Sequence, residues 1–236
     1  MSDKLVIVES PSKSKTIEQY LGKDYTVLSS KGHIRDLAIS GPGGLGLDIE
    51  NGFEPKYSTL KDKNAIVKSL KKAAKKASSV YLATDPDREG EAISWHLQQV
   101  LELDDSSTPS RRVIFNEVTK DAVLEAFDHP RDIDFNLVNS QETRRILDRI
   151  IGFKLSKLLQ NKIKSKSAGR VQSAALKILV NREKEIEAFN SEEYWKITAH
   201  FPYFDAELFK VNSRKPKLPD EDSTEAVYNA LDKTFT

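Results

Sequence analysis

The sequence predicts an α/β fold, in which a parallel sheet flanked by helices is followed by a basic helical segment and the start of a β-containing domain. Short apolar runs of strand length alternate with segments of helical period in the first half of the chain, a pattern typical of parallel sheets. From residue 120 to 187 nearly everything has helical period, and beyond Ser191 apolar residues alternate with period two. We therefore expect three parts: 1–132, 133–190 and 191–236.

Strands are expected wherever four or so apolar residues follow one another, because such runs suit strands that are buried on both faces. A turn is expected at residues 10–12, because Pro11 cannot extend the strand's hydrogen bonding, and the helix that follows is expected to end at Gly22. The expected strands are Leu5–Val8, Tyr25–Leu28, Val80–Ala83 and Val113–Phe115, and the expected helices between them are Ser14–Leu21, Asn64–Ala77 and Ala92–Leu101.

Three further features complete the predicted order. Residues 40–60 hold seven Gly or Pro residues and are expected to form a loop or an insertion. The helical stretch should be interrupted near 128–130 and near 165–169. The period-two alternation of Tyr194–Thr198 predicts a strand that opens the last part.

Composition excludes several classes of protein. The 236 residues are 38% apolar, enough for one large or two modest domains with a core. The absence of cysteine excludes a disulfide scaffold, a cysteine-ligated zinc site and a thiol nucleophile. No apolar run approaches the roughly 18 residues of a membrane span, and no signal peptide precedes the first strand. We therefore expect a cytoplasmic protein that does not bind membranes.

Positive charge is concentrated in one block. The net charge of the chain is +1, yet residues 141–187 hold twelve Lys or Arg against five Asp or Glu. A local excess of this size suits a surface that follows phosphates. The ordinary alternative is a solvated helix face.

Acidic residues cluster where the strand Val80–Ala83 ends and a helix begins. Asp85, Asp87 and Glu89 lie there, at the edge of the sheet where open α/β folds place ligands. Carboxylates that converge repel one another unless a cation lies between them, and oxygen ligands favour Mg²⁺ or Mn²⁺. Alternatively, the two aspartates cap the helix and the glutamates favour its positive end.

Glu9 favours the metal site over simple capping. It follows the first strand, so it should face the same edge if the two strands are neighbours. Nearby carboxylates would raise the pKa of Glu9 and suit it to act as a general acid or base. Capping of one helix does not account for an acid on a separate strand end.

These segments resemble a known family. Val8–Lys13 and Asp85–Glu91 resemble the Toprim domain, which type IA and type II topoisomerases, primases and some nucleases share. Lys31–Leu37, Phe115–Thr119 and Ser167–Ser173 resemble bacterial type IA DNA topoisomerases, in the same order from Lys4 to about Trp195. The stretch 43–57 is more similar to the topoisomerase I branch than to the topoisomerase III branch.

The resemblance implies a Toprim-type sheet, a basic helical DNA-binding segment and the beginning of an arch (gate) domain. It implies an ATP-independent enzyme that relaxes negatively supercoiled DNA by transient single-strand cleavage, through a 5′-phosphotyrosine. The expected partners are single-stranded and negatively supercoiled DNA, and the expected state is a monomer.

The resemblance also implies roles for individual residues. Glu9 would assist proton transfer at the leaving 3′-oxygen and Lys13 would neutralise the scissile phosphate, with Arg144 as a further catalytic group. Mg²⁺ would be held by Glu9, Asp85, Asp87 and Glu89. The implied DNA-binding residues are His33, Arg35, Arg144, Arg145, Asp148, Ser167, Gly169, Arg170 and Gln172.

Ordinary explanations exist for two of these groups. Arg144 and Asp148 stand four apart on one helix, where an ion pair needs no further role; the resemblance makes Asp148 a residue that orients an arginine. The small residues before Arg170 let a phosphate approach a helix N-terminus, but they also suit a plain helix start. His96 and His129 have no partner pattern and are expected to be structural or on the surface.

The family's catalytic tyrosine lies in a Tyr-Met-Arg-Thr-Asp context, and none of the seven tyrosines here has such neighbours. We therefore expect an N-terminal fragment that binds DNA without cleaving it. Two alternatives stay open: a self-sufficient Toprim nuclease or primase-like enzyme, which needs no tyrosine, and a plain nucleic-acid-binding module whose carboxylates are structural.

Overall fold

The structure is a computed structural model that describes residues 4–104, 107–164 and 167–231. The chain divides into two compact units, residues 1–173 and 174–236, and each is described by itself. Residues 1–3, which bear on the expected absence of a signal peptide, and residues 165–166, within the expected interruption, lie outside the described residues.

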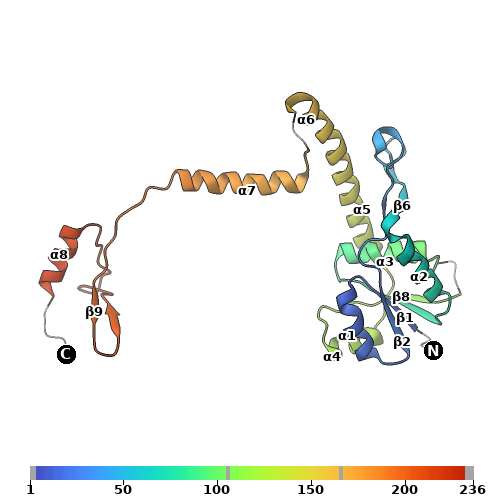
Figure 1. Cartoon of the computed structure of the whole chain (residues 1–236), viewed down its shortest axis with the longest axis horizontal. Coiled ribbons are helices and arrows are strands. Elements are labelled where there is room, and N and C mark those ends of the chain that lie inside the picture. The colour runs from blue at the N-terminus through green and yellow to red at the C-terminus, as the bar shows by residue number, and fades with distance from the viewer. Residues whose placement is uncertain (1–3, 105–106, 165–166, 232–236) are drawn as a thin grey trace. The chain divides into compact units, whose positions relative to one another are not determined.

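The first unit is built on a four-stranded parallel sheet with the strand order β2-β1-β7-β8 (Figure 1). The sheet confirms the predicted α/β class. Val8 pairs with Ala83, so the residues that follow β1 and β7 lie beside one another at the carboxyl edge of the sheet. The strand bounds are β1 Lys4–Val8, β2 Tyr25–Ser29, β7 Ser79–Ala83 and β8 Ser110–Arg112.

Helices cover both faces of the sheet, as the continuous apolar runs predict. Leu5 and Ile7 of β1 pack in one core with α2 and α3, while Val6 and Val8 pack in a second core with α1 and α4. All four of these β1 side chains are at most 2% exposed. The helix bounds are α1 Pro11–Leu21, α2 Asn64–Ala74, α3 Arg88–Val100 and α4 Lys120–Asp128.

The fourth strand lies earlier than predicted. We expected Val113–Phe115, but β8 ends at Arg112, and Val113 only continues the pairing with one hydrogen bond to the Leu82 carbonyl. Arg112 lies within the strand because its guanidinium, 1% exposed, is neutralised by a buried glutamate. A search for apolar runs cannot find a strand that includes such a residue.

The glycine-rich stretch is more ordered than the expected loop. Within it, β4 Leu47–Asp48 pairs with β5 Glu54–Pro55. Its last strand, β6 Tyr57–Thr59, pairs with β3 Arg35–Leu37, which precedes the stretch. Gly46 has a φ of +67°, and a Cβ there would lie 2.0 Å from the Ala38 carbonyl oxygen. Glycine is therefore required for the close approach of these two backbone segments.

A long helical arm follows the sheet. α5, Phe135–Ile150, packs on α3, passes through one π-helical turn at Ile151–Leu155, and continues as α6, Ser156–Ile163. The expected interruption near 128–130 is confirmed between α4 and α5. α7, Arg170–Glu187, begins after the second interruption.

The second unit holds a short hairpin, β9 Thr198–His200 with β10 Asp205–Glu207, and the helix α8 Glu221–Ala230. The strand expected at Tyr194–Thr198 is wrong in its bounds. Tyr194 is 74% exposed, so the alternation does not mark a buried face there. The Trp195 amide instead donates to the Leu218 carbonyl. Within the described part of the chain, no helix is long and apolar enough to cross a membrane.

Candidate metal and nucleic-acid site

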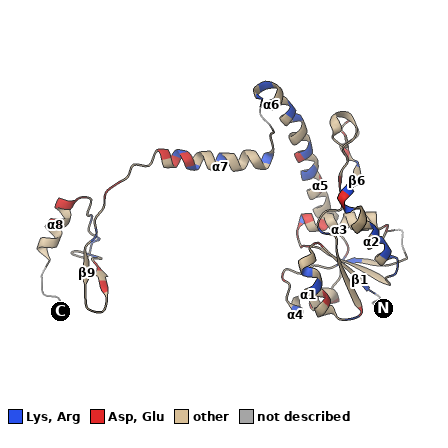
Figure 2. Ribbon diagram, viewed as in Figure 1, with Lys and Arg blue, Asp and Glu red and all other residues tan. Residues whose placement is uncertain are grey.

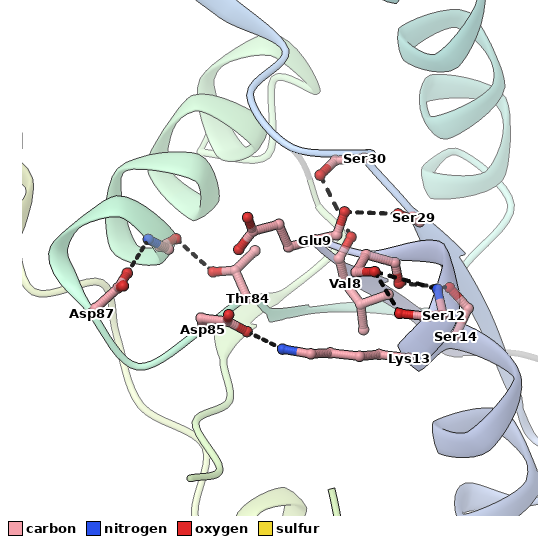
Figure 3. Close-up of polar contacts among 12 residues, drawn as sticks. Val8, Glu9, Ser12, Lys13, Ser14, Ser29, Ser30, Thr84, Asp85 and Asp87 are labelled. Atoms are coloured by element: carbon pink, nitrogen blue, oxygen red, sulfur yellow. Dashed lines mark hydrogen bonds and ion pairs between the residues drawn. The ribbon is translucent and has the colours of Figure 1, made fainter. Parts of the chain in front are cut away.

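The carboxyl edge of the sheet brings Glu9 and Asp85 together, as predicted from the two strand ends. Figure 3 shows Asp85 directed toward Lys13 of α1, with Nζ 2.5 Å from Oδ1. The backbone carbonyl of Glu9 accepts from the Ser29 hydroxyl and the Gly32 amide, which fixes the chain where β1 ends. A lysine, two carboxylates and the loop after β2 therefore meet at this edge.

The pKa of Glu9 is raised above its ordinary value. Burial is the main cause, and the negative charges of Asp85 and Asp87 act in the same direction, while Lys13 and His33 oppose the shift. A carboxyl group with a raised pKa holds its proton more readily and can exchange it nearer neutral pH. The predicted raised pKa of Glu9 is therefore present, with burial as a cause that the sequence does not show.

Asp87 serves as the N-cap of α3. Its Oδ1 accepts from the Gly90 amide at 2.8 Å, as Figure 3 shows. Gly90 allows this tight turn because a Cβ at that position would lie 2.1 Å from the Asp85 carbonyl oxygen. The capping alternative thus describes Asp87 in this structure, and its Oδ2 is the oxygen that capping does not use.

Glu89 points to a different set of partners. Its Oε1 accepts from Arg144 at 3.0 Å, and its Oε2 accepts from the Gln141 amide at 3.1 Å and lies 3.5 Å from His33 Nε2. Glu89 therefore connects α3 to α5 instead of joining Glu9 and Asp85. Among the described residues, no three His, Cys, Asp or Glu side chains are arranged to hold a metal ion.

A polar cavity of about 330 Å³ lies beside this edge, between α3, α5 and the strands β3 and β6. It contains six of the residues predicted to bind DNA or metal, together with four that were not assigned to a site from the sequence. The lining residues are His33, Arg35, Asp36, Tyr57, Glu89, His96, Gln141, Arg144, Arg145 and Asp148.

Asp36 anchors two arginines of α5. Arg145 donates to both of its carboxylate oxygens, with Nε 2.8 Å from Oδ1, and Arg149 lies 3.5 Å away. Burial alone would raise the pKa of Asp36, but the hydrogen bonds from Arg145 and the Leu37 amide hold it below its ordinary value. Arg149 also donates to the Leu37 carbonyl at 2.9 Å, so α5 is fixed to β3.

Asp148 forms an ion pair with Arg170, which belongs to a different helix. Arg170 donates to both Asp148 oxygens, from Nε at 3.0 Å and from Nη2 at 3.2 Å, and Arg144 lies 3.8 Å away. The hydrogen bond from Arg170 lowers the pKa of Asp148. The segment before α7 is attached to α6, because Ser156 exchanges two hydrogen bonds with Ala168.

The rest of this segment stands at the start of α7. Gly169 accepts from the Ser173 amide and hydroxyl, and Gln172 lies beside it, with Oε1 3.5 Å from where a Gly169 Cβ would be. Ser167 precedes them in the chain. Figure 2 shows Lys and Arg along α5 and α6 and at the first residue of α7.

A buried ion network behind the edge was missed by sequence reasoning. Arg112 and Glu91 pair at 3.0 Å with both side chains fully buried, and Glu91 also accepts from Arg131 and from the Asp134 amide. Arg112 donates to four backbone carbonyls as well, those of Leu82, Thr84, Asp85 and Val113. These hydrogen bonds fix the loop that carries Asp85 to β8. The sequence holds no local signal for it, since the partners are 21 residues apart.

His96 was expected to be structural or on the surface; it is 2% exposed and also lines the cavity. Its Nδ1 accepts from Arg35 Nε at 2.5 Å. Burial, with Arg35 and His33 nearby, lowers the pKa of His96 to about 3. The available signal was its spacing, because His96 stands seven residues after Glu89 and so lies on the same face of α3.

Comparisons with known proteins agree with this arrangement. Residues 4–118 match the family model of the Toprim domain, and residues 132–236 match that of DNA topoisomerase. Among solved structures, full-length topoisomerase I from Thermotoga maritima is 42% identical, with a TM-score of 0.70. The alignment covers 94% of this chain and 37% of the Thermotoga protein, so the chain spans little more than a third of that relative's length. The sheet edge, the basic arm and the two family matches lead to one conclusion: the chain belongs to the bacterial type IA DNA topoisomerases.

Proposed function

We propose that this chain supplies the metal-binding and single-strand-binding part of an ATP-independent DNA topoisomerase I, which relaxes negatively supercoiled DNA through a 5′-phosphotyrosine. One observation carries the proposal: Glu89, which begins the helix after Asp85 and Asp87, contacts Arg144 in the arginine-lined cavity, so the acidic edge and the cavity are neighbours. A strand bound by the arginines therefore passes within reach of Glu9, Lys13 and Asp85.

The donor set of the edge fits a hard divalent cation such as Mg²⁺, because Glu9, Asp85 and Asp87 offer only carboxylate oxygens. Burial and neighbouring carboxylates already disfavour the negative charge of Glu9, and a cation would relieve this. Asp87 can contribute its Oδ2 and keep its cap. Glu89, the fourth ligand implied by the resemblance, would first have to leave Arg144.

When bound, the cation would supply positive charge near the scissile phosphate. Three residues of this chain would act around the phosphate that the tyrosine attacks. Glu9 exchanges a proton with the 3′-oxygen, and Lys13 shares its charge between Asp85 and the phosphate. Arg144 donates to the phosphate from the opposite side of the cavity, where Glu89 now fixes it.

The DNA strand would be held by the arginines of the cavity and by the start of α7. Five guanidinium groups, those of Arg35, Arg144, Arg145, Arg149 and Arg170, stand in and around the cavity against four carboxylates, those of Asp36, Glu89, Glu142 and Asp148. This excess of positive charge suits a phosphodiester backbone. His33 beside Glu89, and Ser167, Gly169 and Gln172 before and within the first turn of α7, would add polar contacts.

The first test is a labelled single-stranded oligonucleotide incubated with this chain and Mg²⁺, then divided between native and denaturing gels. The proposal expects a shifted band on the native gel and an uncut oligonucleotide on the denaturing gel. Cleavage that Asp85→Asn abolishes would contradict it and favour a self-sufficient Toprim nuclease. No binding at low salt would contradict the DNA-binding assignment.

A second test uses two matched arginines. Arg170→Ala should reduce the salt dependence of binding by about 0.7 in the slope, the share of one phosphate contact on a single strand. Arg111→Ala is the control, because Arg111 is likewise exposed and paired with an aspartate, Asp132. Equal slopes for the two variants would remove Arg170 from the binding surface.

A further inference from the structure

Arg35 differs from the other arginines around the cavity because it has no carboxylate partner. No Asp or Glu among the described residues lies within ion-pair distance of its guanidinium. The two other arginines that line the cavity each have one, Arg144 with Glu89 and Arg145 with Asp36. The neighbouring Arg149 and Arg170 are likewise paired, with Asp36 and Asp148. The nearest acidic influence is Glu142, which accepts a hydrogen bond from Tyr57 and acts on Arg35 without forming an ion pair with it.

Uncharged groups hold Arg35 instead. Its Cζ lies 4.8 Å from the ring centres of Tyr57 and of Trp95, and these two rings stand at 85° to each other. Its Nε donates to His96 Nδ1. Among the described residues, none accepts a hydrogen bond from its two Nη atoms. Arg35 is thus fixed at Nε and against two rings, while the other edge of its planar fork is left without a protein acceptor.

His96 accepts this hydrogen bond only as the neutral ring with its proton on Nε2, because Nδ1 must offer a lone pair. The ring is almost fully buried in α3 and packs 4.8 Å from the centres of the Tyr57 and Trp95 rings. A carboxylate in its place would neutralise Arg35. An imidazole orients the guanidinium and leaves its charge available to a ligand.

We infer that His96 is a positioning residue, which holds Arg35 so that its free edge binds a backbone phosphate of a single strand in the cavity. The inference rests on the proposed function, since it needs a nucleic-acid strand to enter there. The ligand is a phosphate rather than a base because a positive charge without an ion-pair partner favours an anion, and the fork of a guanidinium matches two phosphate oxygens.

Three variants separate this role from a merely structural one. Arg35→Gln removes the proposed phosphate ligand itself. His96→Phe keeps an aromatic ring beside Tyr57 and Trp95 but offers no acceptor to Arg35. His96→Asn gives up the ring but keeps an acceptor oxygen near the position of Nδ1. A structural role would make Asn at least as damaging as Phe, whereas the inferred role reverses this order.

The measurement is the affinity of the full chain for a fluorescent oligothymidylate across a salt series, with thermal unfolding recorded for each variant. Arg35→Gln and His96→Phe should weaken binding about ten- to hundredfold, the size of one hydrogen bond to a charged group. Both should lower the salt slope by about 0.7, the share of one phosphate on a single strand. His96→Asn should bind like the wild type, even if it unfolds at a lower temperature.

Each other outcome decides a different question. A wild-type slope for His96→Phe, or a loss with His96→Asn as large as with His96→Phe, would overturn the positioning role. An unchanged Arg35→Gln would remove Arg35 from the site while the proposed function stands. A loss that depends on the base composition of the oligonucleotide would assign Arg35 to a base edge and overturn the phosphate. Absence of salt-dependent binding by the wild type would instead refute the proposed function.

Discussion

Arg112 and Glu91 form an ion pair that is shielded completely from solvent, with Arg112 Nε 3.0 Å from Glu91 Oε2 and both side chains 0% exposed. The pair connects β8 to α3 beneath the Asp85 loop, because Arg112 also donates to the Asp85 carbonyl at 2.7 Å. Removing water from two charges costs free energy. Loss of either side chain would leave the other charge buried without its partner, which destabilises the folded protein.

Arg112→Met should therefore destabilise the protein strongly. The substitution leaves Glu91 buried with only Arg131 as a charged partner, and it frees four backbone carbonyls. We expect the free energy of unfolding to fall by about 3–5 kcal/mol, measured by urea titration. Arg111→Met is the matched control on the same strand, where the pair with Asp132 is exposed and its loss should cost about 1 kcal/mol or less. Similar losses for both variants would contradict this prediction.

Gly90→Ala should disturb the acidic edge without touching a charged group. The added Cβ would lie 2.1 Å from the Asp85 carbonyl oxygen, a backbone atom that cannot swing away, so the loop or the start of α3 must shift. We expect a loss of about 1–3 kcal/mol on thermal or urea unfolding. Gly152→Ala is the control, since a Cβ there meets nothing within 4 Å and alanine favours a helix by about 0.5–1 kcal/mol. Stability of Gly90→Ala equal to the wild type would show that the close approach is absent in solution.

The free energy of unfolding should decrease as the pH is lowered, because His96 takes up a proton in the unfolded chain but not in the folded one. The pKa of His96 is about 3 in the folded chain, where burial, Arg35 and His33 disfavour its charge and only Asp36 opposes them. The unfolded pKa is about 6.5, so below that pH the unfolded state takes up a proton that the folded state excludes. The contribution of neutral His96 is complete above pH 6.5 or so and declines by about 1.4 kcal/mol per unit as pH falls toward 3.

The measurement is urea unfolding between pH 4.5 and 7.5 or so, in parallel with His96→Asn. Other groups titrate alike in both proteins, so the difference between their stabilities isolates His96. Parallel curves would show that His96 titrates normally in the folded chain.

Lys13→Gln should strengthen the proposed binding of Mg²⁺. The Lys13 ammonium contacts Asp85 at 2.5 Å and repels a cation at the same carboxylate. Because both side chains are partly exposed, we expect a modest gain of about fivefold in affinity, measured by calorimetric titration of Mg²⁺. Lys15→Gln, an exposed lysine on the same helix, is the control and should change nothing. Weaker binding by Lys13→Gln would mean that Lys13 holds Asp85 in place for the metal.

The parts of the site that sequence could predict are those governed by strand order. The runs ending at Val8 and Ala83 predict two buried parallel strands, and parallel strands that pair must bring Glu9 and Asp85 to one edge. What sequence could not predict are pairings across long separations. Glu89 meets Arg144 at a distance of 55 residues, and nothing local distinguishes this from a free metal ligand.

Arg112 illustrates a second reason. A charged residue inside a strand contradicts the rule that strands buried on both faces are apolar. The burial of Arg112 is possible because Glu91, which belongs to a different element, compensates its charge. The predicted strand was accordingly placed three residues late.

The π-helical turn at Ile151–Leu155 bears on how the length of this chain can vary. A π-turn corresponds to one residue inserted into an α-helix. Deleting one residue there would restore a regular helix and rotate every side chain of α6 by about 100° relative to α5, since successive α-helical residues are that far apart. Arg144 and Arg145 precede the turn and would keep their partners, whereas Lys157 and Lys162 would face another direction. Arg170 follows the turn in a segment attached to α6, so its pair with Asp148 would be lost as well. The length of this one turn therefore sets which positive charges of the outer arm face the cavity.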